Sequence, residues 1–288
     1  MYDLPFDQSY LIENVIDPAH VHISHDGTPN GGKRENAQPL EMEVIESSAK
    51  GIRGMVRETR RPNQPWKPLN FVAPNLIFYE YGIEQRGWFG GLVFYSLPLG
   101  KNRCRVLARN YRNFLTRKVK LIPRWFDHWN RNQLFEEDLQ LVLGQQAQIE
   151  QLGQHLKELF LPLKTSDVLV IEYRKWLDKY GQSLPFYEGY STSKRAGNQA
   201  EYHQTPVPLD RFSGHTQICS SCNRAYQVTN RLKQGSLMVA IAIAALAIVI
   251  DEPVSLKLVT VFAFLAALAM SAVAQTVKTK FERSYERR

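Results

Sequence analysis

Three histidines lie within a stretch of six residues near the start of the chain: His20, His22 and His25. Neutral imidazole is a ligand for iron, zinc, copper and nickel. His20 and His25 are five positions apart, which separates them by roughly 140° on a regular helix. We therefore expect both rings to reach one ion only where a helix ends or is distorted, and His22 to point elsewhere. A pair of histidines alone is a weak indication of a metal site.

A carboxylate far along the chain is the candidate third ligand. Asp138 lies on a predicted helix, and its neighbours at three and four positions are apolar: Leu134, Phe135, Leu141 and Val142. The polar residues Glu136, Glu137 and Gln140 are expected on the other side of that helix. An unpaired buried carboxylate costs several kcal/mol, so Asp138 needs a partner. A metal ion, an arginine or a tyrosine would each serve. Two histidines and one carboxylate form the ligand set of non-haem Fe(II) oxygenases, with open positions for O₂.

The third chemical feature is the cysteine pair Cys219 and Cys222, which with Cys104 makes up all the cysteines of the chain. Three cysteines are too few for a secreted disulfide scaffold and are typical of a reducing compartment. Three interpretations of the pair stay open. It is a redox dithiol, a zinc half-site completed by His215 and His203, or a reduced pair without a function.

Strands are the first of the predicted elements that would position these side chains. Short β-branched and aromatic segments, each bounded by Gly, Pro or Asn, recur from about Leu40 to Leu107. Such a series is typical of an antiparallel sheet. Examples are EMEVIESS, GIRGMVRET, NLIFYEYGI, GLVFYSLPL and CRVLARNY.

Helical periodicity follows the predicted strands. We expect helix over Phe126–Trp129, then over 132–161 with a break at Gly144 or Gly153, and again over Asp167–Tyr180. The stretch 185–227 is rich in Ser, Thr, Gly, Asn and Gln, which indicates loop. The predicted fold class is therefore α+β, with an antiparallel sheet followed by helices.

Two uncharged apolar runs close the chain, Leu237–Ile250 and Leu258–Val277. At about 1.5 Å per helical residue the second run spans about 30 Å, the thickness of a hydrocarbon core. The first run is shorter and reaches that span only with its flanks. Both runs are apolar on every side, which predicts a transmembrane hairpin, with a pair of buried core helices as the alternative.

Charge predicts the orientation of this hairpin. Basic residues flank it on both sides, and the connecting loop holds Asp251 and Glu252. The positive-inside rule then puts both termini and the soluble part on the cytoplasmic side. The flanking basic residues are Arg231, Lys233, Lys278, Lys280, Arg283, Arg287 and Arg288.

The net charge and the N-terminus bear on partners and location. A formal charge of +8 favours acidic partners, such as anionic lipids or an acidic electron carrier. No zinc-finger, helix-turn-helix or RNA-binding signature accompanies the charge, which disfavours nucleic acid. The opening sequence MYDLPFDQSYLIEN has neither the pattern of a signal peptide nor that of a transit peptide, and it reads like the interior of a domain.

Taken together, several motifs resemble the Rieske non-haem iron oxygenases. Asn14-Val-Ile-Asp17-Pro-Ala-His20 followed by His25 is similar to the iron motif of that family, and Glu137-Asp138 is similar to its late ligand. The blocks DPAHVHISHDG and RNYRNFLTRKVKLIPRWFDHWNRNQLFEEDLQLVLGQQ, the downstream CxxC and the apolar hairpin look like the pheophorbide a oxygenase group, which includes chlorophyllide a oxygenase. The resemblance extends from about Leu11 to Val277.

This resemblance implies specific roles. His20, His25 and Asp138 would bind a mononuclear Fe(II), Asp17 would relay electrons between subunits of a homotrimer, and a thioredoxin would switch Cys219 and Cys222. The implied fold is a helix-grip (START-like) antiparallel sheet whose cavity holds a chlorin or porphyrin pigment. Aromatic strand residues are candidates to line that cavity: Phe78, Tyr79, Tyr81, Phe94 and Tyr95.

The sequence departs from the family in one respect. A Rieske [2Fe–2S] cluster is bound by Cys-x-His and Cys-x-x-His, and neither pattern occurs in these 288 residues. We therefore expect a catalytic domain over 1–184, a loop-rich CxxC segment over 185–233, and a hairpin with a basic tail over 234–288. Electrons would come from a Rieske protein, itself reduced by ferredoxin.

The expected function is oxygenation of a pheophorbide a or chlorophyllide a type pigment. The expected location is a thylakoid or plasma membrane of a photosynthetic organism. Two alternatives are a membrane-tethered tetrapyrrole-binding protein without turnover, and a fragment of a split oxygenase gene.

Overall fold

The computed structural model describes residues 1–29, 31–60, 63, 65–83, 86–99, 102–116, 121–152, 165–181, 209–249 and 253–284. These residues form two compact units. The first comprises Met1–Pro123 and Asn130–Val207, and the second comprises Arg124–Trp129 and Pro208–Glu286.

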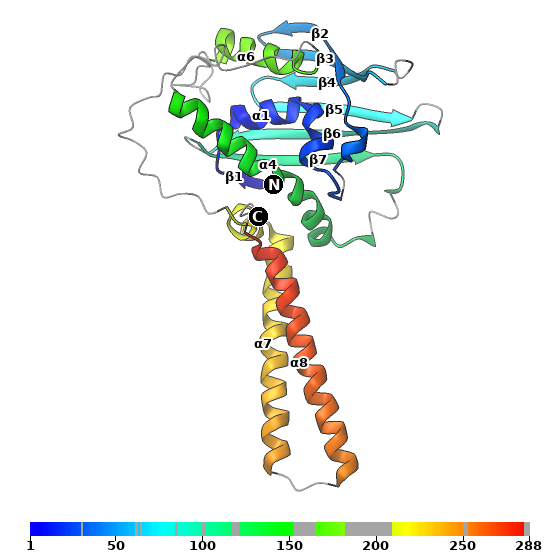
Figure 1. Ribbon diagram of the computed structural model, residues 1–288, viewed down its shortest axis with the longest axis vertical. Coiled ribbons are helices and arrows are strands. Elements are labelled where there is room, and N and C mark those ends of the chain that lie inside the picture. The colour runs from blue at the N-terminus through cyan, green and yellow to red at the C-terminus, as the bar shows by residue number, and fades with distance from the viewer. Residues whose placement is uncertain are drawn as a thin grey trace. The chain divides into compact units, whose positions relative to one another are not determined.

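A seven-stranded sheet is the frame of the first unit, with the strand order β1-β7-β6-β5-β4-β3-β2 (Figure 1). All neighbouring strands are antiparallel, as the alternating segments predicted. The strands are β1 (Tyr2–Leu4), β2 (Leu40–Ser48), β3 (Gly51–Glu58), β4 (Lys67–Val72), β5 (Leu76–Ile83), β6 (Trp88–Pro98) and β7 (Cys104–Arg112).

Two of these strands, β1 and β4, are not among the segments named from the sequence. β4 contains Pro68, a residue that normally argues against a central strand because it lacks a backbone N–H. The pairing explains why it is tolerated. Pro68 is opposite Met55 of β3, whereas the pairing of β4 with β5 begins only at Leu69.

Helices α1 (Gln8–Ile16) and α6 (Val168–Tyr180) pack against the sheet and bury the core of this unit (Figure 1). The ring of Phe71 on β4 meets the rings of Tyr173 and Trp176 of α6 edge-on, with centroids 5.0 and 4.8 Å apart. Gly54 on β3 allows the close approach of α6, because a Cβ there would lie 2.5 Å from Cδ2 of Leu169. The predicted helix over Asp167–Tyr180 is confirmed as α6.

A largely buried ion pair also joins α1 to α6. The guanidinium of Arg174 donates from both Nε and Nη2 to the carboxylate of Glu13, with Nε 2.9 Å from Oε2. The amide of Gln145 donates to the same carboxylate over 3.1 Å. Glu13 therefore connects three helices that are far apart in sequence.

Helix α4 (Arg124–Leu152) follows the sheet and carries the candidate third ligand. It is one continuous helix through Gly144, so the separate helix over 126–129 and a break at Gly144 are not observed. A break at Gly153 would lie outside the described residues.

The second unit is built on helices α7 (Ser220–Val249) and α8 (Val254–Glu282), preceded by a π-helical turn, η7 (Phe212–Thr216). The loop predicted over 185–227 is wrong for residues 212–216 and 220–227, while 185–208 lie outside the described residues. The polar composition of this stretch suggested a loop, although one side of the helix that it forms is buried. Cys219, Cys222 and Phe281 form a buried cluster, against which Trp125 and Trp129 pack.

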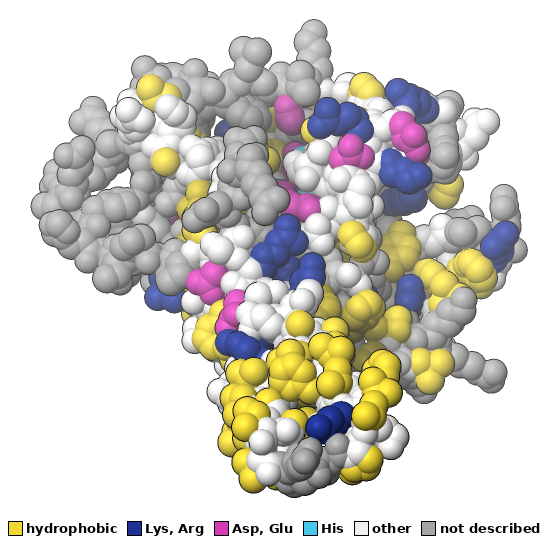
Figure 2. Space-filling model, turned by 60° about the horizontal axis from the view of Figure 1, so that its bottom comes forward, with side chains coloured by type: hydrophobic (Ala, Val, Ile, Leu, Met, Phe, Trp, Pro, Cys, Tyr) yellow, Lys and Arg dark blue, Asp and Glu magenta, His cyan; other side chains and the backbone are white. Residues whose placement is uncertain are grey.

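The two apolar runs fall within α7 and α8, which pack side by side (Figure 1). Small residues are buried between them: Ser236, Ala240, Ala267, Ser271 and Ala274. Both helices are long and apolar enough to cross a membrane, and only 11% and 6% of their most apolar windows are buried. A buried core pair would hide those windows, so their exposure disfavours that alternative. Figure 2 shows hydrophobic side chains gathered on this helix pair.

Candidate metal centre and substrate cavity

The two candidate histidines follow the end of α1. The carboxylate of Asp17 accepts a hydrogen bond from the backbone N–H of Ala19 over 3.0 Å and caps a 3-10 turn, η1 (Pro18–His20). A four-residue helix, α2 (Val21–Ser24), comes next, and His25 is its C-cap residue. The 3-10 turn thus ends at His20 and the regular helix ends just before His25, which is the kind of helix end that their five-residue spacing required.

His20, His25 and Asp138 converge on one point, with their ligand atoms within 4.8 Å of one another. Nε2 of His25 lies 3.3 Å and Nε2 of His20 lies 3.7 Å from Oδ2 of Asp138. The two rings meet nearly edge-on, with their centroids 5.4 Å apart. His25 and Asp138 are buried, at 4% and 6% exposure.

This arrangement fits a mononuclear iron ion. Oδ1 of Asp138 is buried and has no hydrogen-bond partner among the described residues, a costly state that a cation would relieve. Two imidazole nitrogens and one carboxylate oxygen are the donor set of non-haem Fe(II) centres. All three residues also line the cavity described below.

The electrostatics of the site favour positive charge. Burial acts to lower the pKa of His20, but the carboxylates of Asp17 and Asp138 outweigh it and raise that pKa above its usual value. Burial acts in the same way on His25, and there Asp138 and Glu137 raise the pKa above its usual value. Acidic groups therefore surround both rings at the position where a divalent cation would bind.

Sequence reasoning missed the role of Glu137. Its carboxylate lies 3.0 Å from Nδ1 of His25 and accepts hydrogen bonds from Thr28 over 2.5 Å and from Gln133 over 3.0 Å. A metal-binding histidine generally donates its other ring N–H to such an acceptor, and this hydrogen bond fixes the orientation and the tautomer of the ring. The adjacent Glu-Asp pair in the sequence was the signal that could have indicated this role.

The expected distribution of side chains around Asp138 needs correction. Glu136 was expected on the polar side of the helix, but it is 1% exposed and accepts a hydrogen bond from the hydroxyl of Tyr2 over 3.3 Å. Leu141 was expected in the apolar stripe, but it is 56% exposed. The buried side of α4 is thus partly polar, because it faces both the metal centre and the buried tyrosine.

His22 points away from the other two histidines, as expected. Its Nδ1 accepts a hydrogen bond from the backbone N–H of Lys33 over 3.2 Å. This contact holds the ring against the following loop and leaves His22 outside the convergent group.

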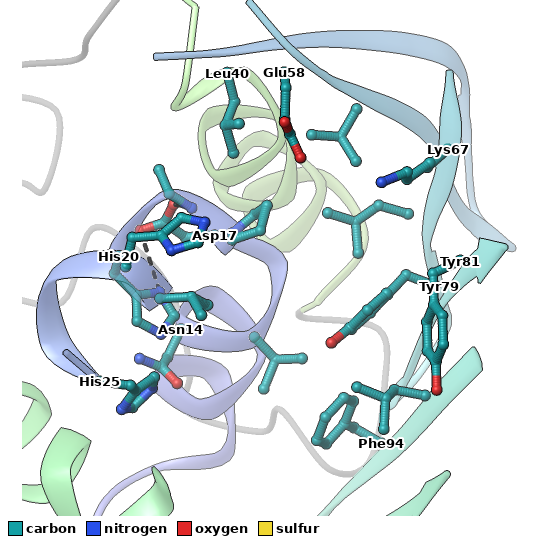
Figure 3. Close-up of a pocket in the computed structure, with 18 of the residues that line it drawn as sticks. Asn14, Asp17, His20, His25, Leu40, Glu58, Lys67, Tyr79, Tyr81 and Phe94 are labelled. Atoms are coloured by element: carbon teal, nitrogen blue, oxygen red, sulfur yellow. Dashed lines mark hydrogen bonds and ion pairs between the residues drawn. The ribbon is translucent and has the colours of Figure 1, made fainter. Parts of the chain in front are cut away.

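A cavity of about 370 Å³ opens beside the three candidate ligands. That volume lies in the range of small-molecule sites, roughly 300–1,000 Å³. Figure 3 shows the histidines and Asp17 on one wall, and Tyr79, Tyr81 and Phe94 of the sheet on the opposite wall. Burial raises the pKa of Tyr79 to about 12, so its hydroxyl stays protonated and can donate. Its ring stacks with that of Phe94 at 6.4 Å.

Two of the aromatic residues considered for the cavity do not line it. Phe78 and Tyr95 are absent from its walls, whereas Tyr79, Tyr81 and Phe94 are present. Side chains alternate between the two faces of a strand, so Phe78 points away from the face that presents Tyr79, and Tyr95 away from that of Phe94.

The cysteine pair lies in the second unit. Cys219 and Cys222 are both buried at the start of α7, beside His128 of α4 and His215 of η7. His203, which was considered as a zinc ligand, lies outside the described residues.

Comparison with known proteins identifies relatives of this chain. The family model described as pheophorbide a oxygenase matches residues 71–155, a range that includes Asp138. The pea protein TIC 55 of chloroplasts is 32% identical over 87% of this chain and 50% of its own length. The Arabidopsis thaliana chloroplast pheophorbide a oxygenase is 27% identical over 81% of this chain and 46% of its own length.

A solved structure was also matched. Pseudomonas putida NdmA with caffeine is 18% identical, with a TM-score of 0.42, over 61% of this chain and 48% of its own. The chain spans about half the length of the curated relatives it matches. The sequence matches therefore relate this chain to the pheophorbide a oxygenase group of the Rieske-type oxygenases.

Proposed function

We propose that this chain carries the mononuclear-iron centre of an oxygenase that acts on a chlorin or porphyrin pigment. The observation that supports this most is the convergence of His20, His25 and Asp138, in which Oδ1 of Asp138 is buried without a hydrogen-bond partner among the described residues. When bound, the iron would supply the activation of O₂. The residues of the chain orient the substrate, exclude water and hold the ligand rings.

The cavity supports a flat aromatic substrate of limited polarity. Leu92, Phe94, Phe135 and Leu134 give it apolar walls, while Lys67 and Glu58 are charged groups that line it. An ammonium group such as that of Lys67 pairs with a carboxylate, and porphyrin-type pigments carry carboxylates on their side chains. The neutral hydroxyl of Tyr79 is a hydrogen-bond donor for a carbonyl. Names of relatives support the same substrate class, since one of them is a pheophorbide a oxygenase.

Electrons are proposed to come from a Rieske centre outside these 288 residues, reduced in turn by ferredoxin. Asp17 supports this route because its side chain is 27% exposed and its Oδ2 lies 3.7 Å from Nδ1 of the candidate ligand His20. The carboxylate thus contacts both the solvent and a ligand ring. Transfer between subunits would require a homotrimer, which sedimentation of the full chain in detergent would detect.

The proposed location is a membrane of a plastid or of another photosynthetic cell compartment. Exposed apolar faces on α7 and α8 support membrane insertion, and the chloroplast relatives support the compartment. Basic residues near the paired ends of the helices, such as Arg231, Lys233 and Lys280, favour a soluble part on the stromal or cytoplasmic side.

Iron binding is the direct test of this function. The purified chain should bind about one Fe(II), and addition of nitric oxide should give an electron paramagnetic resonance signal from iron with an open position. His20→Ala, His25→Ala and Asp138→Ala should each lose the signal. His22→Ala is the matched control and should keep it. Full iron binding by Asp138→Ala would show that the third ligand is another residue.

Pigment binding tests the substrate separately. Pheophorbide a and chlorophyllide a should bind with a shift in their visible absorption, and Leu92→Trp should weaken binding by filling the cavity. Leu107→Trp is the control, because Leu107 is exposed and is not among the residues that line the cavity. Pigment binding without any iron would instead favour a carrier without turnover.

A further inference from the structure

Four potential metal ligands gather in the second unit, apart from the residues of the proposed iron centre. They are His128, His215, Cys219 and Cys222, and their ligand atoms all lie within 4.8 Å of one another. We propose that these four side chains bind a structural zinc ion. This site does not depend on the function proposed above, since it shares no residue with the iron centre.

The distances match the edges of a zinc-centred tetrahedron. Nε2 of His215 lies 3.2 Å from Sγ of Cys222, and Nδ1 of His128 lies 3.4 Å from Sγ of both cysteines. With Zn–S of about 2.3 Å and Zn–N of about 2.0–2.1 Å, tetrahedral geometry separates nitrogen and sulfur ligands by about 3.5 Å. Two thiolates and two imidazoles are also a common ligand set of structural zinc sites.

Local backbone geometry brings three of the ligands to one side. His215, Cys219 and Cys222 follow one another at spacings of four and three residues, which puts them on one helical face. His215 belongs to the π-helical turn η7, and such turns commonly adjust the direction of a functional side chain. The backbone N–H of Cys219 donates to the carbonyl of His215 over 3.0 Å, so the turn and the start of α7 are continuous.

The surroundings are those of a closed structural site. Cys219, Cys222 and His215 are buried, and Trp125, Trp129 and Phe281 pack around the cysteines. The hydroxyl of Thr216 donates to the carbonyl of Phe281 over 2.8 Å, which joins η7 to the end of α8. A zinc ion bound here would therefore connect the first residues of α4, the turn η7 and the start of α7. The end of α8 packs against these elements through Phe281.

A redox dithiol at Cys219 and Cys222, switched by a thioredoxin, is the rival interpretation. It needs only the two cysteines and gives no role to the two histidines. A zinc ion explains why all four side chains converge. It would hold both sulfurs as thiolates and prevent a disulfide between them.

Metal analysis of the full chain in detergent tests the proposal. About one zinc per chain is expected, and Cys219→Ser, Cys222→Ser and His215→Asn should each lose most of it. Cys104→Ser is the matched control, because Cys104 is a buried cysteine of the first unit, and it should keep the zinc. His20→Ala should lose iron and keep zinc, so the two sites can fail independently.

Two measurements on the unmodified chain cover the case in which ligand variants do not fold. Cobalt exchanged into the site should give the intense visible bands of tetrahedral cobalt together with sulfur-to-metal charge transfer. A mercurial should release zinc in step with its addition to Cys219 and Cys222, as followed with a zinc-binding dye and mass spectrometry. Zinc release without modification of these cysteines would overturn the proposal. So would iron in the cluster, or a zinc-free protein with a Cys219–Cys222 disulfide, which would favour the dithiol.

Discussion

Nδ1 of His25 lies 3.0 Å from the carboxylate of Glu137, while Nε2 of the same ring lies 3.3 Å from the carboxylate of Asp138. Two adjacent residues of α4 therefore contact the two nitrogens of one imidazole. In the neutral tautomer that donates Nδ1–H to Glu137, His25 would present the lone pair of Nε2 toward Asp138. We therefore expect Asp138 to act as a metal ligand and Glu137 to orient the ring of His25.

Glu137→Gln should weaken iron binding without abolishing it. The amide can still accept a hydrogen bond from His25, but it lacks the charge that makes the ring a stronger ligand. Loss of such a supporting carboxylate typically costs about 10- to 100-fold in metal affinity. Titration with Fe(II) under anaerobic conditions would measure the change.

Glu46→Gln is the control for this experiment, because Glu46 is an exposed carboxylate that pairs with Arg53 on the sheet surface. Its iron affinity should equal that of the parent. Equal affinities for Glu137→Gln and the parent would show that Glu137 serves the loop around Thr28 rather than the metal centre.

Glu13→Gln should destabilise the first unit. Arg174 is 9% exposed and would lose the charge of Glu13, which weakens the contact that α1, α4 and α6 share. Breaking a buried ion pair in this way typically costs about 3–5 kcal/mol. Urea unfolding followed by tryptophan fluorescence would measure the loss.

An exposed pair provides the comparison for that measurement. Glu46→Gln breaks the contact with Arg53 at the surface, where an ion pair contributes about 0–1 kcal/mol. A loss for Glu13→Gln as small as that for Glu46→Gln would mean that solvent reaches the Arg174 guanidinium.

The sequence allowed the sheet and the candidate iron ligands to be predicted for a clear physical reason. Each strand has its own alternation and its own turn residues, so β2, β3, β5, β6 and β7 can each be recognised locally. The spacing of His20 and His25 was likewise informative, because it requires that a helix ends or is distorted, and α2 ends at His25.

The strand β4, the helical start of α7 and the position of His128 depend on contacts between residues that are distant in sequence. Local composition therefore did not indicate these features. Pro68 is tolerated in β4 only because of where the neighbouring strand begins to pair. The start of α7 is rich in polar residues, yet it is helical because one side packs against Phe281 and two tryptophans. His128 was not considered as a ligand, since its partners follow about ninety residues later.

Cys104 should make stability fall at alkaline pH. Its side chain is fully buried, and burial raises the pKa of its thiol well above the usual 9.0, with a smaller contribution from the charge of Asp7. In the unfolded chain the thiol loses its proton above about pH 9, which favours unfolding. The contribution of Cys104 is therefore complete below pH 9 and declines above it, by at most about 1.4 kcal/mol per pH unit.

Urea unfolding of the parent and of Cys104→Ala between pH 8 and pH 10.5 would test this dependence. The stability difference between the two proteins should change over that range, because only the parent carries the titrating thiol. A constant difference would mean that the Cys104 thiol ionises equally in the folded and unfolded chain.

Charge introduced on the outer faces of α7 and α8 should release the chain from membranes. Ile241 and Leu265 are 61% and 53% exposed within the apolar runs. An aspartate near the centre of a membrane-spanning helix costs about 2.5–3.5 kcal/mol. The double variant Ile241→Asp/Leu265→Asp should therefore appear in the supernatant after an alkaline carbonate wash.

Val228→Asp is the control, since Val228 is 58% exposed on α7 but precedes the apolar run. That variant should stay in the pellet with the parent. A double variant that also stays in the pellet would shift the attachment to the basic residues, and high salt would then release it.

Asp17→Asn should separate electron supply from iron binding. Asparagine can keep the cap on the N–H of Ala19, because its side-chain oxygen accepts as well as that of aspartate. The charge beside Nδ1 of His20 is lost, and with it the exposed carboxylate that links the surface to a ligand ring. Iron content should therefore equal that of the parent, while turnover supported by a separate Rieske protein and ferredoxin should fall to background.

Asp26→Asn is the matched control, because Asp26 lies in the loop that follows His25 and accepts a hydrogen bond from the N–H of Arg34. It should keep both iron and turnover. The parent without the Rieske protein should bind iron and pigment but give no sustained turnover, since each O₂ consumed requires electrons from outside. Repeated turnover by the parent alone would contradict the proposed route. Electrons would then come from the substrate or a soluble reductant, and Asp17 would be only the cap of the turn that positions His20.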